Sequence, residues 1–172
     1  MNMITGFDPI CGPGCRVLIL GSMPSVRSLE LSQYYGHPRN AFWPIMCELL
    51  EGRYIEDYSR RAQLLLEHGI ALWDVCHCCE RETSSDARIR NEVPNDIAGL
   101  ANRFGIEHVL LNGGAAASLY RRHVALDLPC TRLPSTSPAY TLKYEAKRDA
   151  WREALEAVGI PLAPAHANLQ RA

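Results

Sequence analysis

Small and polar side chains follow four short apolar runs of the sequence, and amide and carboxylate groups are among them. The four clusters are Gly21-Ser22, Asp74, Asn112-Gly113 and Ser135-Thr136-Ser137. A carboxylate accepts hydrogen bonds from N–H groups, and an asparagine amide both donates and accepts, so it can orient a water molecule. Brought together, such groups would bind a polar ligand and position water for attack on it.

The richest stretch runs from Arg16 to Trp43 and reads RVLILGSMPSVRSLELSQYYGHPRNAFW. Its apolar run, Val17 to Leu20, is too short for a helix and rich in branched residues, which predicts a buried strand. The turn that follows, Gly21 to Ser25, is typical of ligand sites in α/β proteins, because backbone amides and the next helix converge there. A purely structural loop does not account for the types that come next, which are Tyr35, His37, Asn40 and Trp43.

Hydrophobic periodicity predicts strands that alternate with helices along the chain. The predicted strands are 17–20, 70–75, 108–112 and 130–134, and the predicted helices are 40–50, 57–68, 96–104, 115–123 and 143–158. This alternation predicts an α/β fold with three layers, α/β/α, around a central four-stranded parallel sheet. The four polar clusters then lie along one edge of the sheet. We expect residues 1–15 to be a loop and residues 80–95 to be a polar connection.

Length and composition are those of an ordinary globular protein. We expect a single domain over residues 1–172, with a loose tail at 160–172. No apolar run is long enough to span a bilayer, so we expect a cytoplasmic protein with no membrane partner. The net charge of -1 argues against a protein that coats DNA, and any contact with nucleic acid must use a local basic face. We expect a monomer.

Seven cysteines raise the question of a metal or iron–sulfur site. The cluster Cys76-His77-Cys78-Cys79 and the pair Cys11 and Cys15 lack two matched Cys-x-x-Cys units, so their spacing fits such a site poorly. We expect reduced cysteines, no metal and no cofactor. The glycine pattern of a dinucleotide site is also absent from the sequence.

The turn GSMPS and the segment YYGHPRNAFW resemble the first motif of the uracil-DNA glycosylase superfamily. They are similar to the mismatch-specific branch, with its G-I-N-P-G and H-P-x-N-x-F-W, and look closest to the hypoxanthine (deoxyinosine) DNA glycosylase branch. The resemblance extends from Arg16 to about Tyr140. It implies a monofunctional glycosylase in base excision repair, acting on DNA that contains a deaminated base. Such an enzyme hydrolyses the N-glycosidic bond of a flipped-out hypoxanthine, and possible activity on uracil is left open.

The water-positioning residue of the superfamily often stands third in the first turn, as Asp or Asn. Here that position is Met23, which cannot bind water. The resemblance moves the role to Asn40, which matches the asparagine of the H-P-x-N element. An asparagine is a poor base, so the reaction would depend mainly on stabilising the departing base. Capping the following helix is the structural alternative for Asn40, and the two roles are compatible.

The resemblance also assigns Tyr35 and Asp74, whereas Asn112 is assigned from its place at the end of a predicted strand. Tyr35 would stack on the flipped base, a contact worth about 1–3 kcal/mol, or be ordinary packing. Asp74 would accept from a ring N–H of the base, or cap loop amides. Asn112 would donate to the base in catalysis, or simply form a turn. The base-binding turn comprises Gly21, Ser22, Met23 and Pro24.

Ser135 to Ala139 resembles the second motif of the superfamily. That motif begins with histidine in other members, whereas Ser or Thr stands at this position here. A cationic donor to the departing base is therefore missing at that position. Ala139 is small for a wedge between bases, and Tyr140 is the alternative. The predicted DNA-binding residues are Ser25, Ser135, Thr136, Ser137, Pro138, Ala139 and Tyr140. The basic residues Arg121, Arg122, Lys143, Lys147 and Arg148 would face phosphates or form a solvated helix surface.

Two other classes of protein stay open at this point. One is a catalytically inactive DNA-binding module of the same fold, which would keep Tyr35 and a basic face. The other is an α/β enzyme of free nucleosides or nucleotides, which would need a closed pocket and no wedge near Ala139.

Overall fold

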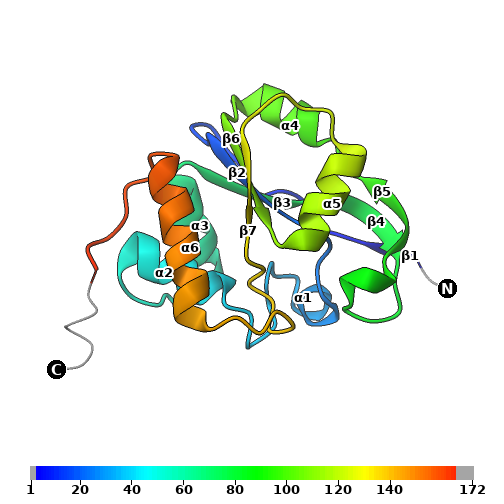
Figure 1. Ribbon diagram of the computed structural model, residues 1–172, viewed down its shortest axis with the longest axis horizontal. Helices are drawn as coiled ribbons and strands as arrows, with labels where there is room; N and C mark the ends of the chain where they lie inside the picture. Colours follow the sequence, from blue (N-terminus) through cyan, green and yellow to red (C-terminus); the bar gives the residue numbers. More distant parts are fainter. Residues whose placement is uncertain (1–2, 166–172) are drawn as a thin grey trace.

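Two separate sheets form the framework of the chain (Figure 1), seen in a computed structural model that describes residues 3–165. The larger sheet has four parallel strands in the order β3-β2-β6-β7. Their bounds are β2 Val17–Gly21, β3 Ile70–Asp74, β6 His108–Asn112 and β7 Cys130–Leu133. This is the predicted central sheet, with each predicted strand reproduced to within one residue.

Helices cover both faces of the parallel sheet. On β2, Val17 and Ile19 belong to one hydrophobic cluster and Leu18 and Leu20 to the other, as the two-residue alternation of a strand requires. Figure 1 shows α2, α3 and α6 on one side of the sheet and α4 and α5 on the other. The predicted three-layer α/β/α fold is confirmed. These helices are α2 Phe42–Glu51, α3 Tyr58–Glu67, α4 Ile97–Phe104, α5 Gly114–His123 and α6 Tyr144–Ala157.

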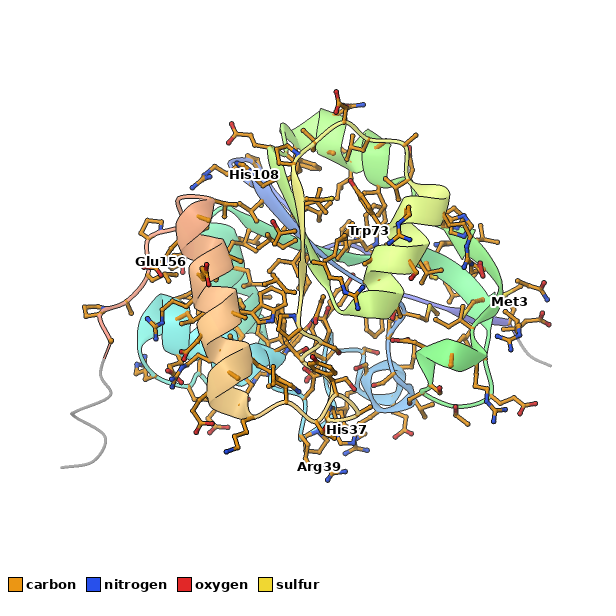
Figure 2. The ribbon with its side chains drawn as sticks, in the orientation of Figure 1. Met3, His37, Arg39, Trp73, His108 and Glu156 are labelled. Atoms are coloured by element: carbon orange, nitrogen blue, oxygen red, sulfur yellow. The ribbon has the colours of Figure 1, made fainter. Side chains whose placement is uncertain are left out.

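The strand register places the predicted polar clusters at one edge. Gly21 pairs with Asp74 across β2 and β3, and Asn112 pairs with Leu133 across β6 and β7. The short helix α1, Val26–Leu31, which the sequence did not predict, follows the first turn at this edge. His37 and Arg39 lie at the same end of the molecule, far from His108 at the opposite end of β6 (Figure 2).

The smaller sheet was missed by sequence reasoning. It is antiparallel, with the order β1-β4-β5, and joins β1 Met3–Thr5, β4 Cys76–Glu80 and β5 Arg90–Pro94. The prediction that residues 1–15 are only a loop is therefore wrong. The polar connection 80–95 likewise contains β5 and a 3-10 turn, η1 Asp86–Arg88. Both strands are short and largely exposed, so neither carries an apolar run.

The predicted loose tail begins with anchored residues. Ile160 is buried in the core, and the backbone N–H of Ala163 donates to the carbonyl of Leu49 at 2.8 Å. Residues 166–172 lie outside the described part of the chain. Within residues 3–165, no helix combines the length and the apolar character needed to cross a membrane.

Helix α4 allows a matched test of capping. The Asp96 carboxylate accepts from the backbone N–H of Gly99 at 3.0 Å, whereas Asp57 precedes α3 without a side-chain capping bond. We expect Asp96→Ala to lower the free energy of unfolding by about 1 kcal/mol, because it leaves that N–H without its acceptor. Asp57→Ala should cost clearly less. Urea unfolding of both variants measures the difference, and equal losses would contradict it.

Candidate active site

A polar cavity of about 90 Å³ opens at the carboxyl edge of the parallel sheet. Its walls come from the first turn, the loop before α2, the ends of β3 and β6, the loop after β7 and the segment around η1. All the predicted catalytic and base-binding residues line it, namely Asn40, Asn112, Gly21, Ser22, Met23, Pro24, Tyr35 and Asp74. The structure thus brings together predicted catalytic and base-binding residues that are up to 91 positions apart in the sequence, from Gly21 to Asn112.

The end of β2 carries the tightest contact of the site. A Cβ atom built on Gly21 would lie 2.5 Å from Asp74 Oδ1 and 2.7 Å from Tyr35 Oη. Only glycine lets both polar groups approach the strand so closely. Because Gly21 has no side chain, the Asp74 carboxylate and the Tyr35 hydroxyl can both lie next to its Cα atom.

Asp74 is a buried carboxyl group with an unpartnered oxygen. It is 4% exposed, and its Oδ2 atom has no hydrogen-bond partner among the described residues. Burial, and secondarily the negative charge of Asp86, raises the pKa of Asp74 to about 7, although Arg81 acts in the opposite direction. A buried polar atom without a partner costs free energy, so this oxygen is suited to meet a ligand.

Tyr35 adds a second unpartnered polar atom to the cavity. Its backbone is in the left-handed region, with φ at 53°, where a bulky residue is uncommon. Its ring stacks on Phe42 with the centroids 4.2 Å apart, and its Oη atom has no hydrogen-bond partner within residues 3–165. Burial, and then the Asp74 carboxylate, raises the pKa of Tyr35. Phe42 covers one ring face, so a base stacking on Tyr35 would use the other.

Asn40 lines the cavity and contacts the start of α2, but it is not the N-cap residue that its structural alternative predicted. Its Oδ1 atom accepts from the backbone N–H of Phe42 at 2.9 Å, at the start of α2, although Ala41 is the residue at the N-cap position. A carbonyl oxygen has two lone pairs. The bond to Phe42 fixes the orientation of the amide and leaves the second lone pair for a water molecule.

Asn112 is committed to the loop after β7. Its Nδ2 atom donates to Thr136 Oγ1 at 3.0 Å, and its Oδ1 atom accepts from the backbone N–H of Thr136 at 3.0 Å. These two bonds use most of the amide, so the structure gives Asn112 a bracing role. Its donation to a base stays a prediction that would have to use the remaining amide hydrogen.

The predicted DNA-binding residues divide into two groups. Those that line the cavity are Ser25, Ser135, Thr136 and Ser137, whereas Pro138, Ala139 and Tyr140 lie outside it. Tyr140 is 48% exposed, next to the cavity loop, and is thus better placed than the small Ala139 to meet DNA. Ser25 also caps α1, because its side chain accepts from the backbone N–H of Ser28 at 3.1 Å.

The proposed basic face is only partly a free surface. Lys147 is buried, donates to the carbonyl oxygen of Ser137 at 3.0 Å and lies over the Tyr140 ring, so it supports the loop from behind. Burial lowers the pKa of this amine. Arg122 pairs with Glu92 and Arg148 with Glu48. Arg121 and Lys143 stay exposed.

Sequence reasoning missed four residues that line the cavity, which are Ser28, Tyr34, Ser84 and Asp86. Two of them come from the polar segment 80–95. Asp86 accepts from the Ser22 hydroxyl at 2.8 Å, and Ser84 accepts from the backbone N–H of Val26 at 2.9 Å. Partial loss of hydration raises the pKa of Asp86, opposed by the bond from Ser22. The available signal was the run of polar residues directly after Asp74.

The cysteines form no cluster of the kind that a metal needs. Among residues 3–165, no three His, Cys, Asp or Glu side chains are grouped closely enough to hold a metal ion. The seven cysteines are all free thiols.

Comparisons with known proteins agree with this fold. Residues 9–158 match the uracil DNA glycosylase superfamily. Two curated proteins called hypoxanthine DNA glycosylase are 31% identical to this chain. The one from Methanosarcina barkeri aligns over 88% of this chain and 97% of its own length. The one from Methanosarcina acetivorans aligns over 85% and 94%.

A solved structure of a similar protein has the same fold. The solution NMR structure of a candidate uracil DNA glycosylase from Methanosarcina acetivorans superposes with a TM-score of 0.75 at 30% identity, over 90% of this chain and 99% of that one. The chain belongs to the uracil DNA glycosylase superfamily. It is accordingly an enzyme of the DNA glycosylase class, a hydrolase of N-glycosyl bonds.

The contact at Gly21 can be tested directly. In Gly21→Ala the added methyl group must displace both Asp74 and Tyr35, and we expect the rate of base release from the DNA substrate to fall roughly 100-fold, because small misplacements are costly in catalysis. Gly12→Ala is the matched control, since a Cβ there meets only Leu66 Cδ2 at 3.9 Å. Circular dichroism checks that both variants fold. Equal activity in the two would show that the contact is unimportant.

The buried carboxyl group also predicts a dependence of stability on pH. Because folding raises the pKa of Asp74 from its ordinary value to about 7, ionisation penalises the folded state increasingly as pH rises to that value. Asp74→Asn removes the penalty. We expect this variant to gain roughly 2–4 kcal/mol in the free energy of unfolding at pH 8 and almost nothing at pH 3. Urea unfolding at both pH values measures this, and a gain independent of pH would refute the assignment.

Proposed function

We propose that this glycosylase removes hypoxanthine from deaminated DNA, with uracil as the second candidate base. The observation that carries the proposal is the grouping of Asn40, Tyr35 and Asp74 around one cavity, in which two buried polar atoms have no partner. The names of the two similar curated proteins support hypoxanthine as the base.

The base would enter the cavity after flipping out of the helix. A glycosidic bond inside a duplex is out of reach of the enzyme, so the nucleotide must leave the base stack. Tyr140 is exposed beside the cavity and suited to fill the space that the base vacates. Ser25, Ser135 and Ser137 line the cavity, and their hydroxyl groups suit contacts to phosphates on either side of the flipped nucleotide.

Asp74 would recognise the base edge inside the cavity. Hypoxanthine and uracil each carry a ring N–H next to a carbonyl group, and a carboxyl oxygen accepts from such an N–H. The free Oδ2 atom supplies that acceptor. Tyr35 would hold the plane of the base by stacking, with its other face against Phe42.

Asn40 would hold the attacking water. Its amide is fixed by the backbone of Phe42, so it presents its remaining lone pair in one direction. As the C1′–N bond breaks, positive charge develops on the sugar, and a water held by Asn40 adds to that carbon. Because an amide is a poor base, the rate should depend on how well the departing base is stabilised.

The first test is release of hypoxanthine or uracil from single- and double-stranded oligonucleotides that hold one inosine or one uracil, scored by alkaline cleavage. We expect Asn40→Ala to lose roughly 100-fold in the single-turnover rate on inosine DNA, because it removes the water-binding group. The same change should cost about 1 kcal/mol in stability through the lost bond to Phe42.

The matched control is Asn102→Ala, since Asn102 is exposed on α4 and away from the cavity. It should keep the wild-type rate. Full activity in Asn40→Ala would mean that another group holds the water. Cleavage of uracil DNA alone would refute hypoxanthine as the base, and tight binding of DNA without any release would indicate an inactive binding protein.

A further inference from the structure

The cavity contains no cationic side chain that could give a proton to the departing base. Its lining includes no Lys, Arg or His among residues 3–165. The Tyr34 hydroxyl already donates to the Asp8 carbonyl at 2.7 Å, and Asn112 is bound to Thr136. Burial raises the pKa of Tyr35, which makes it a still weaker acid. Among lining residues with dissociable protons, the carboxyl groups of Asp74 and Asp86 remain.

Asp74 and Asp86 form a carboxyl pair on the two sides of the first turn. Asp74 ends β3 beside Gly21, and Asp86 accepts from the hydroxyl of Ser22, the next residue along the turn. Asp74 is 4% exposed with a free Oδ2 atom, whereas Asp86 is exposed at the cavity mouth. The negative charge of Asp86 adds to burial in raising the pKa of Asp74, so the more buried of the two carboxyl groups is the one that holds a proton.

The neighbouring groups do not neutralise this pair. Arg81 lies behind the turn and donates to the Pro24 carbonyl, but it forms no ion pair with either carboxylate in the described chain. Its charge lowers the pKa of both groups without overcoming burial. The other titratable groups whose charges couple to Asp74 are acids, from the loop before α2 and from β4, namely Tyr34, Tyr35 and Cys76.

We propose that Asp74 is the catalytic acid of this enzyme, that it holds a proton which it donates to the departing base, and that Asp86 is the positioning residue whose charge keeps the proton there. This inference rests on the proposed function and deepens it, because it assigns the group that stabilises the leaving base. It also distinguishes the role of Asp74 in binding, which needs an acceptor, from its role in catalysis, which needs a donor. A carboxyl group with one proton supplies both.

In this arrangement the reaction balances in protons and electrons. The bond between the sugar C1′ and the base nitrogen breaks, and its electron pair goes to the base. The Asp74 proton neutralises the base at a ring nitrogen or carbonyl oxygen. Water then adds its oxygen to C1′ and releases one proton, which returns to the carboxyl pair through solvent. The enzyme ends in its starting protonation state, and no oxidant or reductant is needed.

The protonation of Asp74 can be measured without substrate. Carboxyl ¹³C NMR of the full chain, titrated from pH 5 to 9 and assigned with Asp74→Asn, should show a midpoint near 7 for Asp74. In Asp86→Asn, whose amide can still accept from Ser22, the midpoint should fall by roughly one pH unit, because the neighbouring negative charge is gone. Glu82→Gln is the control, since it removes an exposed charge of the same segment outside the cavity. It should leave the midpoint in place.

The kinetic measurement is the single-turnover rate on inosine DNA over the same pH range. An acid must be protonated to act, so the wild-type rate should be level below about pH 7 and fall above it. The fall should move to lower pH in Asp86→Asn and stay in place in Glu82→Gln. Asp74→Asn should lose roughly 100-fold and lose the pH dependence, since an amide donates a hydrogen bond but no proton.

Each outcome decides the proposal. An Asp74 carboxyl that is ionised throughout the titration overturns it, and so does base release whose pH profile is the same in Asp86→Asn, while the proposed function stands in both cases. If wild-type enzyme releases neither hypoxanthine nor uracil at any pH, the proposed function fails and the donor role fails with it. Matched shifts in the NMR midpoint and in the rate profile support the pair.

Discussion

The close approach of Asp74 and Tyr35 to the backbone of Gly21 is the constraint on which the rest of the site depends. The parallel register fixes Asp74 opposite Gly21, and the stacking of Tyr35 on Phe42 fixes the ring above them. Tyr35 adopts a left-handed backbone conformation that isolated chains disfavour, so the surrounding core must hold it there. The geometry of the polar groups is thereby tied to the rigid sheet and to α2, and a flexible loop alone does not set it.

The connection between β4 and β5 of the small antiparallel sheet supports the first turn from the outside. Arg81 donates to the Pro24 carbonyl, Ser84 accepts from the Val26 amide, and Asp86 accepts from the Ser22 hydroxyl. These three bonds hold successive parts of the first turn and the start of α1. The same segment adds the negative charge of Asp86 to the cavity mouth. One addition to the α/β/α fold therefore both orders the turn and changes the acidity of the group beneath it.

The sequence was sufficient for the parallel sheet and for the residues at its edge, because buried strands leave continuous apolar runs and parallel strands align their carboxyl ends. The sequence was insufficient for polar residues whose positions are set by hydrogen bonds to distant parts of the chain. Asp86 and Ser84 are placed by bonds to residues about 60 positions away, and the largely exposed strand β5 that follows them has no apolar pattern. The pairing of Asn112 with Thr136 and the burial of Lys147 depend likewise on long-range contacts. Tertiary neighbours, and not local propensity, decide such positions.

Met23 explains why the proposed chemistry must fall on other groups. Its side chain is 6% exposed and packs with Leu20 and Val75 in a hydrophobic cluster, so the position that would suit a water-binding residue serves the core instead. In the proposed mechanism Asn40 would orient the water but supply little basicity. An enzyme with so weak a general base gains most from making the nucleobase a better leaving group. A protonated acid in the cavity would do that. The buried carboxyl group reduces stability at neutral pH, a cost that packing alone gives no reason to retain. Its presence at the end of β3 is understandable if the proton itself is the useful feature.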